Sequence, residues 1–298
     1  MDPRFAPCSV NHVRIRGLQK THESVVRQEL ASAGLGHAST LGEIADACLR
    51  VASALESLQV FDGVDLLIDS APSSASDTAG RPLTDVVCTV AEKKNLVSAS
   101  TAATTQGGEN SLESKVSVRN YLGRAEQIEM QMEAGQQKSS MLRLSAARPR
   151  WMGTDALLSA DMTKQSVSHI KHSSFVEKLL RAGISAKVGS PSESGGCHEL
   201  SYKLEQREVC RLTQSTASWS IRLQQGLSLK SALTHTYTRS TLDDVLMPTS
   251  GAMLRLATEV AGIAPLPLGD ARFCKQTVTT ALFAPILPQV RPLWRALI

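Results

Sequence analysis

Two histidines stand three residues apart in the stretch SVSHIKHSS, an H-x-x-H spacing that also occurs in metal sites. Zinc sites in proteins use three or four ligands. No acidic residue accompanies His169 and His172 in this stretch, which lies between two runs of alternating polarity. We therefore expect a solvated loop here, and the sequence predicts neither a metal nor a cofactor.

Other residues that could do chemistry lack the partners that the chemistry needs. The stretch GLGHAST has glycines but no G-x-G-x-x-G after a strand, so it does not predict a phosphate site. No Ser, His and Asp form a nucleophile motif. Glu129 and Glu133 would need a partner acid for general acid–base work, and the pattern places none. We expect a protein that is not an enzyme.

The spacing of the cysteines and the distribution of charge narrow the class of protein that the sequence predicts. None of the six cysteines forms a C-x-x-C pair, so we interpret them as separate small hydrophobic residues. Lys and Arg are interleaved with Asp and Glu, and the net charge of +4 is diffuse. Basic runs with interspersed aromatic residues are missing, so we expect no nucleic-acid partner.

Hydropathy alone would favour a soluble protein. The N-terminus has no apolar core of a signal peptide. No run approaches the roughly 18 apolar residues that a spanning helix needs. The nearest, 277–290, is interrupted by Pro285 and Pro288. Transmembrane β-strands alternate, however, and escape such a scan.

The elements that would position any site fall into two unlike segments. Up to Lys93 the order β-α-α-β-β is predicted. Thr40 and Glu43 form a capping box at the start of the second helix, whose apolar stripe would face a sheet. From about Asn95, helical periodicity largely stops. About ten alternating runs follow, many near the 9–11 residues that a tilted strand needs to cross a bilayer. One of them spans 216–224.

The stretch KVSVRNYLGRAEQIEMQMEAGQ predicts a hairpin within the second segment. With NYLGR as a five-residue loop, Val116 pairs with Ile128 and Lys115 pairs with Glu129. One face is then apolar and the other charged. A soluble sandwich or barrel would also alternate in this way, so two alternatives stay open. Short turns in sequence order and the lack of covering helices favour a membrane barrel.

Five motifs, in order, carry a resemblance to a known family: VRIRGLQKTHESVVRQEL, FDGVDLLID, NYLGRAEQIEMQ, LQQGLSLKSALTHTYTRS and GAMLRLATEVAG. The chain resembles the barrel subunit of the mitochondrial sorting and assembly machinery. That family belongs, with bacterial BamA and the chloroplast Toc channel, to the outer-membrane insertase superfamily, which carries the bacterial surface antigen domain. The resemblance covers roughly residues 10–276.

The resemblance implies a fold, a location and partners. Residues 8–93 would form an α+β POTRA domain in the intermembrane space. Residues 95–283 would form the N-terminal part of an antiparallel transmembrane β-barrel in the mitochondrial outer membrane. The implied function is to fold and insert β-barrel precursor proteins. The implied partners are these precursors, accessory subunits of the machinery and membrane lipid.

In this family the first barrel strand opens and offers its edge to the incoming precursor by strand addition. On that basis we predict a substrate-binding edge strand composed of small, weakly hydrophobic residues. Its members are Leu96, Val97, Ser98, Ala99, Ser100, Thr101, Ala102, Ala103, Thr104 and Thr105. The polar sets of the alternating runs would face a wet lumen. They include Lys115, Glu129, Gln131, Glu133 and Arg222.

Two features of the family are not found. The R-G-F signature of the inward loop and the C-terminal insertion-signal strand are both missing. Proline removes ladder donors, so we expect poor strands after Gln276 and a divergent tail over 284–298. We therefore expect a barrel truncated at its C-terminal side. The alternative is a soluble or peripheral POTRA-type binding module without insertase activity.

Overall fold

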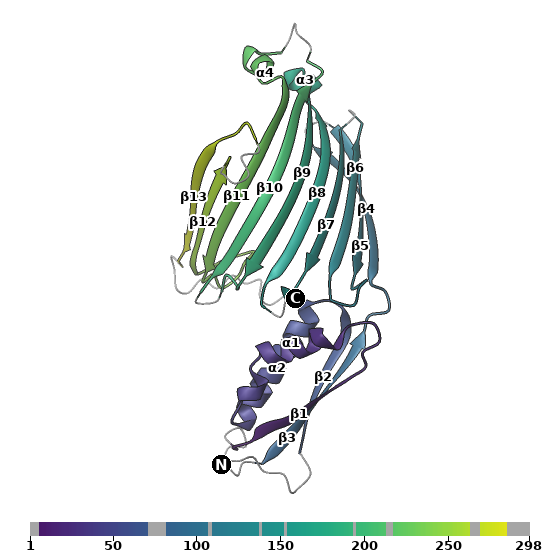
Figure 1. Cartoon of the computed structure of the whole chain (residues 1–298), viewed down its shortest axis with the longest axis vertical. Helices are drawn as coiled ribbons and strands as arrows, with labels where there is room; N and C mark the ends of the chain where they lie inside the picture. The colour runs from purple at the N-terminus through teal and green to yellow at the C-terminus, as the bar shows by residue number, and fades with distance from the viewer. Residues whose placement is uncertain are drawn as a thin grey trace. The chain divides into compact units, whose positions relative to one another are not determined.

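The computed structural model describes residues 6–70, 82–106, 109–136, 139–151, 154–192, 195–212, 217–262 and 269–284 (Figure 1). The chain divides into two compact units, residues 1–154 and 155–298. The predicted domain boundary near residue 94 falls inside the first unit. Each unit is described by itself below.

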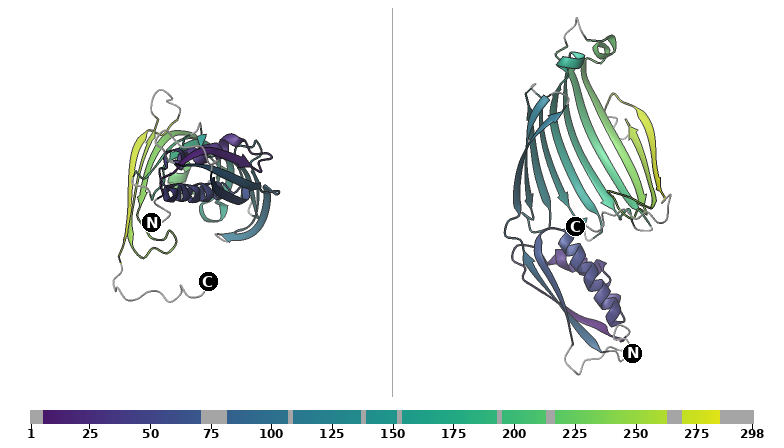
Figure 2. Two further views of the ribbon diagram at one scale, coloured as in Figure 1. Left: turned by 90° about the horizontal axis from the view of Figure 1, so that it is seen from below. Right: turned by 180° about the vertical axis from the view of Figure 1, so that it is seen from behind.

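The first unit begins with a small α+β module. Its elements follow the predicted β-α-α-β-β order. They are β1 (Ser9–Arg16), α1 (Glu23–Ser32), the short 3-10 helix η2 (Leu35–His37), α2 (Leu41–Ser57), β2 (Phe61–Ser70) and β3 (Leu83–Glu92). The sheet order is β1-β3-β2, with β1 parallel and β2 antiparallel to β3. Figure 2 shows both α-helices on one face of this sheet.

The start of α2 confirms the predicted capping residues. The Glu43 backbone N–H donates to Thr40 Oγ1 over 3.3 Å. The Glu43 carboxylate reaches back and accepts from the Ser39 N–H at 2.7 Å, which satisfies another donor at this helix end. The Ser39 hydroxyl donates to the same carboxylate, and the two hydrogen bonds from Ser39 lower the pKa of Glu43.

The apolar stripe of α2 packs on the sheet as the periodicity predicts. Ile44, Val51 and Leu55 are fully buried against Val86 and Cys88 of β3. Burial, with a smaller contribution from the neighbouring Cys48, raises the pKa of the Cys88 thiol to about 11. All six cysteines are free, and four of them are buried (Cys8, Cys48, Cys88 and Cys197).

The remaining strands form one antiparallel sheet of ten, in chain order from β4 to β13. In the first unit these are β4 (Val97–Gln106), β5 (Glu109–Arg119), β6 (Gln127–Gly135) and β7 (Ser140–Arg148). In the second they are β8 (Leu157–Ser168), β9 (Val176–Val188), β10 (Cys197–Cys210), β11 (Gly226–Ser240), β12 (Gly251–Ala261) and β13 (Phe273–Phe283). The predicted up-and-down meander is confirmed.

Two short helices, α3 (Ile170–Ser173) and α4 (Trp219–Leu223), interrupt the second unit. No helix in the described ranges has the length and apolar character required to cross a membrane.

The predicted hairpin register is wrong by two residues. Val116 pairs with Met130 and Val118 with Ile128, because the connection covers 120–126 rather than 120–124. Inside it, the Asn120 N–H donates to the Glu126 carbonyl, and the Glu126 carboxylate accepts from the Leu122 and Arg124 N–H groups. A shift of two is even, so every side chain keeps its predicted face.

The expectation of poor strands after Gln276 is also wrong for residues 277–283. They complete β13, which pairs with β12 from Gly251↔Phe283 to Ala261↔Phe273. No proline falls inside this strand. The prolines on which the expectation rested begin at Pro285, outside the described residues.

Candidate functional site

The four charged or amide residues predicted for the wet face of the β5–β6 hairpin lie together on one face. The ladder places Lys115 opposite Gln131, Glu129 opposite Ser117 and Glu133 opposite Glu113. Lys115 Nζ lies 3.1 Å from Glu129 Oε1, and Gln131 Nε2 donates to Glu113 Oε1 at 2.8 Å. Such half-exposed pairs contribute about 0–1 kcal/mol each, so they set the polarity of the face more than its stability.

Arg222 does not join this set, and its assignment to a strand is wrong. It lies in α4, where its Nε donates to the Ala217 carbonyl at 2.9 Å. The cause is strand pairing. β10 and β11 pair with each other from Cys197↔Thr238 to Val209↔Gly226, so Arg222 falls between the two strands and has no strand to pair with.

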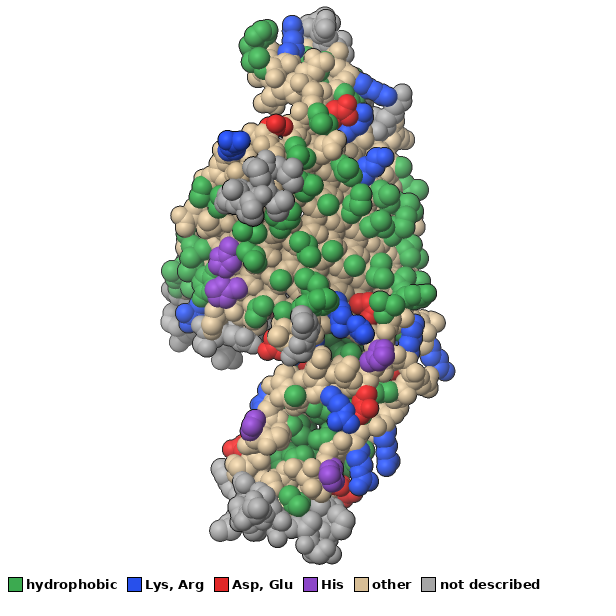
Figure 3. All heavy atoms as spheres, in the orientation of Figure 1, with side chains coloured by type: hydrophobic (Ala, Val, Ile, Leu, Met, Phe, Trp, Pro, Cys, Tyr) green, Lys and Arg blue, Asp and Glu red, His purple; other side chains and the backbone are tan. Residues whose placement is uncertain are grey.

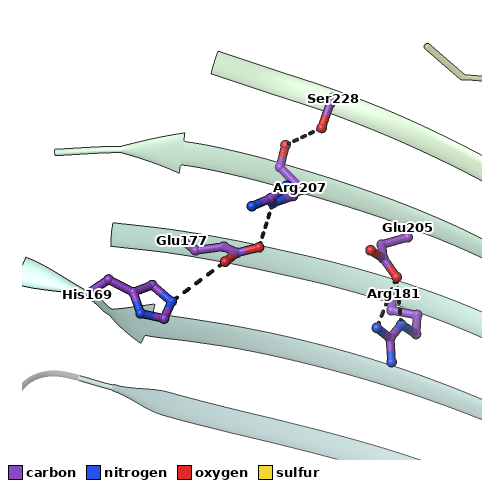
Figure 4. Close-up of polar contacts among 6 residues, drawn as sticks. All are labelled: His169, Glu177, Arg181, Glu205, Arg207 and Ser228. Carbon is purple, nitrogen blue, oxygen red and sulfur yellow. Dashed lines mark hydrogen bonds and ion pairs between the residues drawn. The ribbon is translucent and has the colours of Figure 1, made fainter. Parts of the chain in front are cut away.

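The corresponding face of the second unit carries a ladder of ion pairs on β9 and β10 (Figure 4). Arg181 Nε and Nη2 each lie 3.0 Å from Glu205 Oε2. Arg207 Nε donates to Glu177 Oε1 at 2.6 Å, and His169 Nε2 lies 3.7 Å from the other oxygen of Glu177. Further along, Lys230 Nζ lies 2.6 Å from Glu259 Oε1. Positive and negative side chains therefore alternate across this face.

The opposite face of this part of the sheet is apolar and exposed. Six large apolar side chains on this face are each between 39% and 60% exposed: Leu180, Ile184, Val188, Leu200, Leu233 and Val278. Register puts them on one side, since Val188 lies opposite His198 and Leu233 opposite Tyr202. Figure 3 shows hydrophobic side chains spread over the strands, with charged ones gathered toward the strand ends. An apolar surface that spans several strands is typical of a membrane or protein contact.

The predicted substrate-binding strand is an edge of the sheet. β4 begins at Val97, one residue later than predicted, although the Leu96 carbonyl still accepts from the Arg119 N–H at 2.8 Å. In the described part of the chain β5 is its one neighbouring strand, and residues 97–105 are all exposed. Its other edge therefore presents backbone N–H and C=O groups without a ladder partner.

The side chains of β4 make few contacts that would fix a register. Thr104 Oγ1 lies 2.8 Å from Ser111 Oγ, and Thr105 Oγ1 donates to Asn110 Oδ1 at 2.8 Å. Ser98, Ser100 and Ala102 face the same side as Lys115. A strand of small and hydroxyl residues specifies its pairing weakly.

Sequence reasoning missed the buried polar residues of the 120–126 turn. Asn120 is fully buried; its Nδ2 donates to Thr21 Oγ1 at 2.8 Å and its Oδ1 accepts from the Ala125 N–H at 2.9 Å. The backbone of Asn120 is left-handed, with φ of 52°, a conformation that Asn tolerates better than most residues. An Asn at the head of the NYLGR turn was the available signal.

The second missed feature is a buried ion pair in the first unit. Glu29 of α1 is 1% exposed, and its carboxylate accepts two hydrogen bonds of 2.7 Å from Arg150. The partners are 121 residues apart, and no local pattern connects them.

In the described residues no three His, Cys, Asp or Glu side chains converge on a metal site. His169 lies at the start of α3, against Glu177 and 4.8 Å from the Phe175 ring. The side chain of His172 is outside the described set.

Comparison with known proteins then identifies the family. Residues 120–292, more than half of the chain, match the Omp85 superfamily domain. The chain belongs to the Omp85 superfamily. The matched range includes the strands from β6 to β13 of the ten-stranded sheet just described.

Relatives of this Omp85 chain include a SAM50-like protein of Schizosaccharomyces pombe, 30% identical over 90% of this chain and 56% of that protein. The sorting and assembly machinery component 50 homolog of Homo sapiens is 28% identical over 90% of this chain and 54% of that protein. The chain thus spans about half the length of the curated relatives it matches.

Solved structures show the same fold at low identity. BamA from Haemophilus ducreyi, in a form lacking POTRA domains 1–3, superposes with a TM-score of 0.67 at 15% identity. The match covers 94% of this chain and 52% of that one. CdiB from Acinetobacter baumannii gives a TM-score of 0.56 at 12% identity, over 92% of this chain and 48% of that one.

Proposed function

We propose that this chain contributes the N-terminal part of an insertase barrel that folds β-barrel precursors into the mitochondrial outer membrane. The observation that carries the proposal is the ten-stranded meander of an Omp85 protein with an ion-paired face and an apolar face. The apolar face contacts lipid and the ion-paired face lines a wet lumen. A soluble binding module is not favoured, because it would leave this apolar surface in water.

The N-terminal module acts as a POTRA domain in the intermembrane space. Its β-α-α-β-β order supports this assignment. The BamA superposition supports it too, since a match over 94% of the chain has to include most of residues 8–93. Accessory subunits of a sorting and assembly machinery are its expected partners, as the names of the relatives suggest.

The working edge is β4. An incoming precursor strand adds to its free backbone groups and gains hydrogen bonds that lipid cannot supply. The weak side-chain register of β4 allows the added strand to exchange. In this step the precursor strand is recognised through backbone hydrogen bonds and no covalent bond forms, so the chain needs no cofactor for it.

Disulfide cross-linking in isolated mitochondria tests the proposal. In a Cys274→Ser background, which removes the exposed native thiol, Ala103→Cys is placed on β4. Ala182→Cys, an exposed alanine on the interior strand β9, is the matched control. We expect adducts with a precursor that carries one terminal-strand cysteine at residue 103 and not at residue 182. Adducts at both positions equally, or at neither, would contradict the role of β4.

A further inference from the structure

A polar patch interrupts the apolar face of the second unit near one end. This Arg239 patch consists of Arg239, Tyr237 and His235 of β11 with His198 of β10. Alternate residues of β11 share a face, and the ladder sets Tyr237 opposite His198, so all four side chains lie on one side. His198, His235 and Arg239 are exposed. Figure 3 shows histidines among the hydrophobic side chains of this surface.

Contacts within the patch hold its two imidazoles together. His198 Nδ1 and His235 Nε2 are 3.2 Å apart, and the Tyr237 ring lies 4.8 Å from the His198 ring. The two nitrogens share one proton in an N–H···N hydrogen bond. The ring that accepts this bond carries its own proton on its outer nitrogen, whichever ring that is. The pair therefore presents one outward N–H donor in either arrangement.

The patch lies at the ends of its strands. Arg239 is the next-to-last residue of β11, and His198 is the second residue of β10. Toward the middle of these strands the same face carries exposed Leu200 and Leu233. An arginine at the end of a lipid-facing strand extends its guanidinium to the headgroups, while its methylene groups stay against hydrocarbon.

The opposite end of this face also carries a cation, but that cation is neutralised. Lys178 Nζ lies 3.0 Å from Glu208 Oε2. Lys178 and Val188 share this face of β9, and Val188 lies opposite His198. At about 3.3 Å per residue and a strand tilt of about 40°, the two rows are roughly 25 Å apart along the membrane normal, as in transmembrane barrels. If the apolar face contacts lipid, its two ends therefore fall at the two headgroup levels.

Arg239 has no such carboxylate. In the part of the chain that the structure describes, no acidic side chain forms an ion pair with it, and its ladder partner is Leu254. The nearest acids along the chain, Asp243 and Asp244, accept hydrogen bonds from backbone N–H groups of their own loop. A cation at headgroup level without a protein carboxylate draws its counter-charge from the lipid.

We propose that the Arg239 patch binds the phosphate group of an anionic phospholipid. This inference rests on the proposed function, because it needs the apolar face to contact lipid. The Arg239 guanidinium pairs with two phosphate oxygens, a geometry that suits arginine. The outward imidazole N–H and the Tyr237 hydroxyl donate to the remaining headgroup oxygens. An anionic lipid is preferred to a zwitterionic one, because the patch has no carboxylate to receive a headgroup cation.

Native mass spectrometry of the full chain in detergent micelles, with added phosphatidylglycerol or phosphatidylcholine, tests the patch. We expect one phosphatidylglycerol per chain to bind more tightly than phosphatidylcholine. Arg239→Gln should weaken phosphatidylglycerol binding about tenfold, the factor that corresponds to one lost charge-assisted hydrogen bond, and should remove the preference. Arg255→Gln is the matched control. Arg255 is exposed on β12 and lies opposite Thr238 on the ion-paired face, so its loss should leave the preference intact.

Equal phosphatidylglycerol binding by Arg239→Gln and the unmodified chain would overturn the proposal. An equal loss in Arg255→Gln would overturn it too, because the response would then follow net charge alone. Should Arg239→Gln not fold, as judged by circular dichroism, equal affinity of the unmodified chain for both lipids would be decisive against the patch.

Flotation with phosphatidylcholine vesicles separates this test from that of the proposed function. A chain that does not float with these vesicles would contradict the lipid-facing assignment itself. A chain that floats with them but shows no preference for phosphatidylglycerol would overturn the Arg239 patch alone.

Discussion

At the scale of single residues, buried polar groups organise the first unit. Asn120 uses both ends of its amide, toward Thr21 and toward Ala125, while fully excluded from water. Glu29 depends in the same way on the Arg150 guanidinium. A buried polar group stabilises only while its partners remain, and removal of one partner leaves the other with its desolvation penalty.

Asn120→Ala should therefore destabilise the first unit well beyond an ordinary surface change. The substitution leaves the Thr21 hydroxyl and the Ala125 N–H without their bonds, at about 1–3 kcal/mol for each unsatisfied buried group. It also puts alanine into a left-handed conformation. The effect is measured by urea unfolding of the full chain in micelles, with hydrogen exchange of the Ala125 amide as the readout. Asn110→Ala, at an exposed asparagine of β5, is the control, and equal losses in both variants would refute the argument.

At the scale of elements, the end of β3 holds the connection from β1 to α1. The Glu92 carboxylate accepts from the N–H groups of Gln19, Lys20 and Thr21, at 3.1, 2.9 and 2.8 Å. Partial burial raises its pKa, but the bonds from Thr21, Lys20 and Gln19 outweigh burial, and the net effect lowers the pKa below the ordinary 4.5. The ionised carboxylate is thus favoured in the folded state.

This lowered pKa makes the connection acid-sensitive. The stabilisation by Glu92 is fully present above the unfolded-state pKa and is lost as the pH falls through the lower folded-state pKa. We expect Glu92→Gln to reduce the exchange protection of the Lys20 and Thr21 amides at pH 7. The difference from the unmodified chain should shrink below about pH 4.5. Glu23→Gln, at an exposed i,i+4 pair with Arg27, should show no such pH dependence, and a constant difference for Glu92→Gln would contradict the assignment.

The elements also show where sequence reasoning succeeds and where it stops. Long runs such as β9 and β10 were predictable, because a strand between two chemically different media alternates over its whole length. The run 216–224 alternates too, yet residues 219–223 form α4, because β10 and β11 pair with each other and leave no strand partner for this helix. The hairpin register depended on bonds inside the 120–126 turn, and the Glu29–Arg150 pair on a contact across 121 residues. The partners in such contacts are set by the fold and not by local pattern.

At the scale of the whole molecule, the orientation of the two faces decides the function. Ile184 and Ser185 are consecutive in β9 and therefore lie on opposite faces. Ile184 is opposite Tyr202 on the apolar face, and Ser185 is opposite Ser201 on the ion-paired face. If the apolar face contacts lipid, a charge at residue 184 has to enter hydrocarbon, whereas a charge at residue 185 stays in the wet lumen.

Ile184→Lys and Ser185→Lys make this difference measurable. A lysine on the lipid face near the middle of the bilayer costs about 2–4 kcal/mol, and one on the lumen face costs little. We expect Ile184→Lys to lower the fraction of chain that becomes protease-protected in lipid vesicles and to shift its urea midpoint down, with Ser185→Lys close to the unmodified chain. In a soluble protein an exposed Ile→Lys change is nearly neutral or helpful to solubility, so the difference between the two variants would vanish or reverse. If Ile184→Lys were as stable as Ser185→Lys or more stable, the assignment of the apolar face to lipid would be wrong, and with it the insertase proposal. The strand pairing itself would stand.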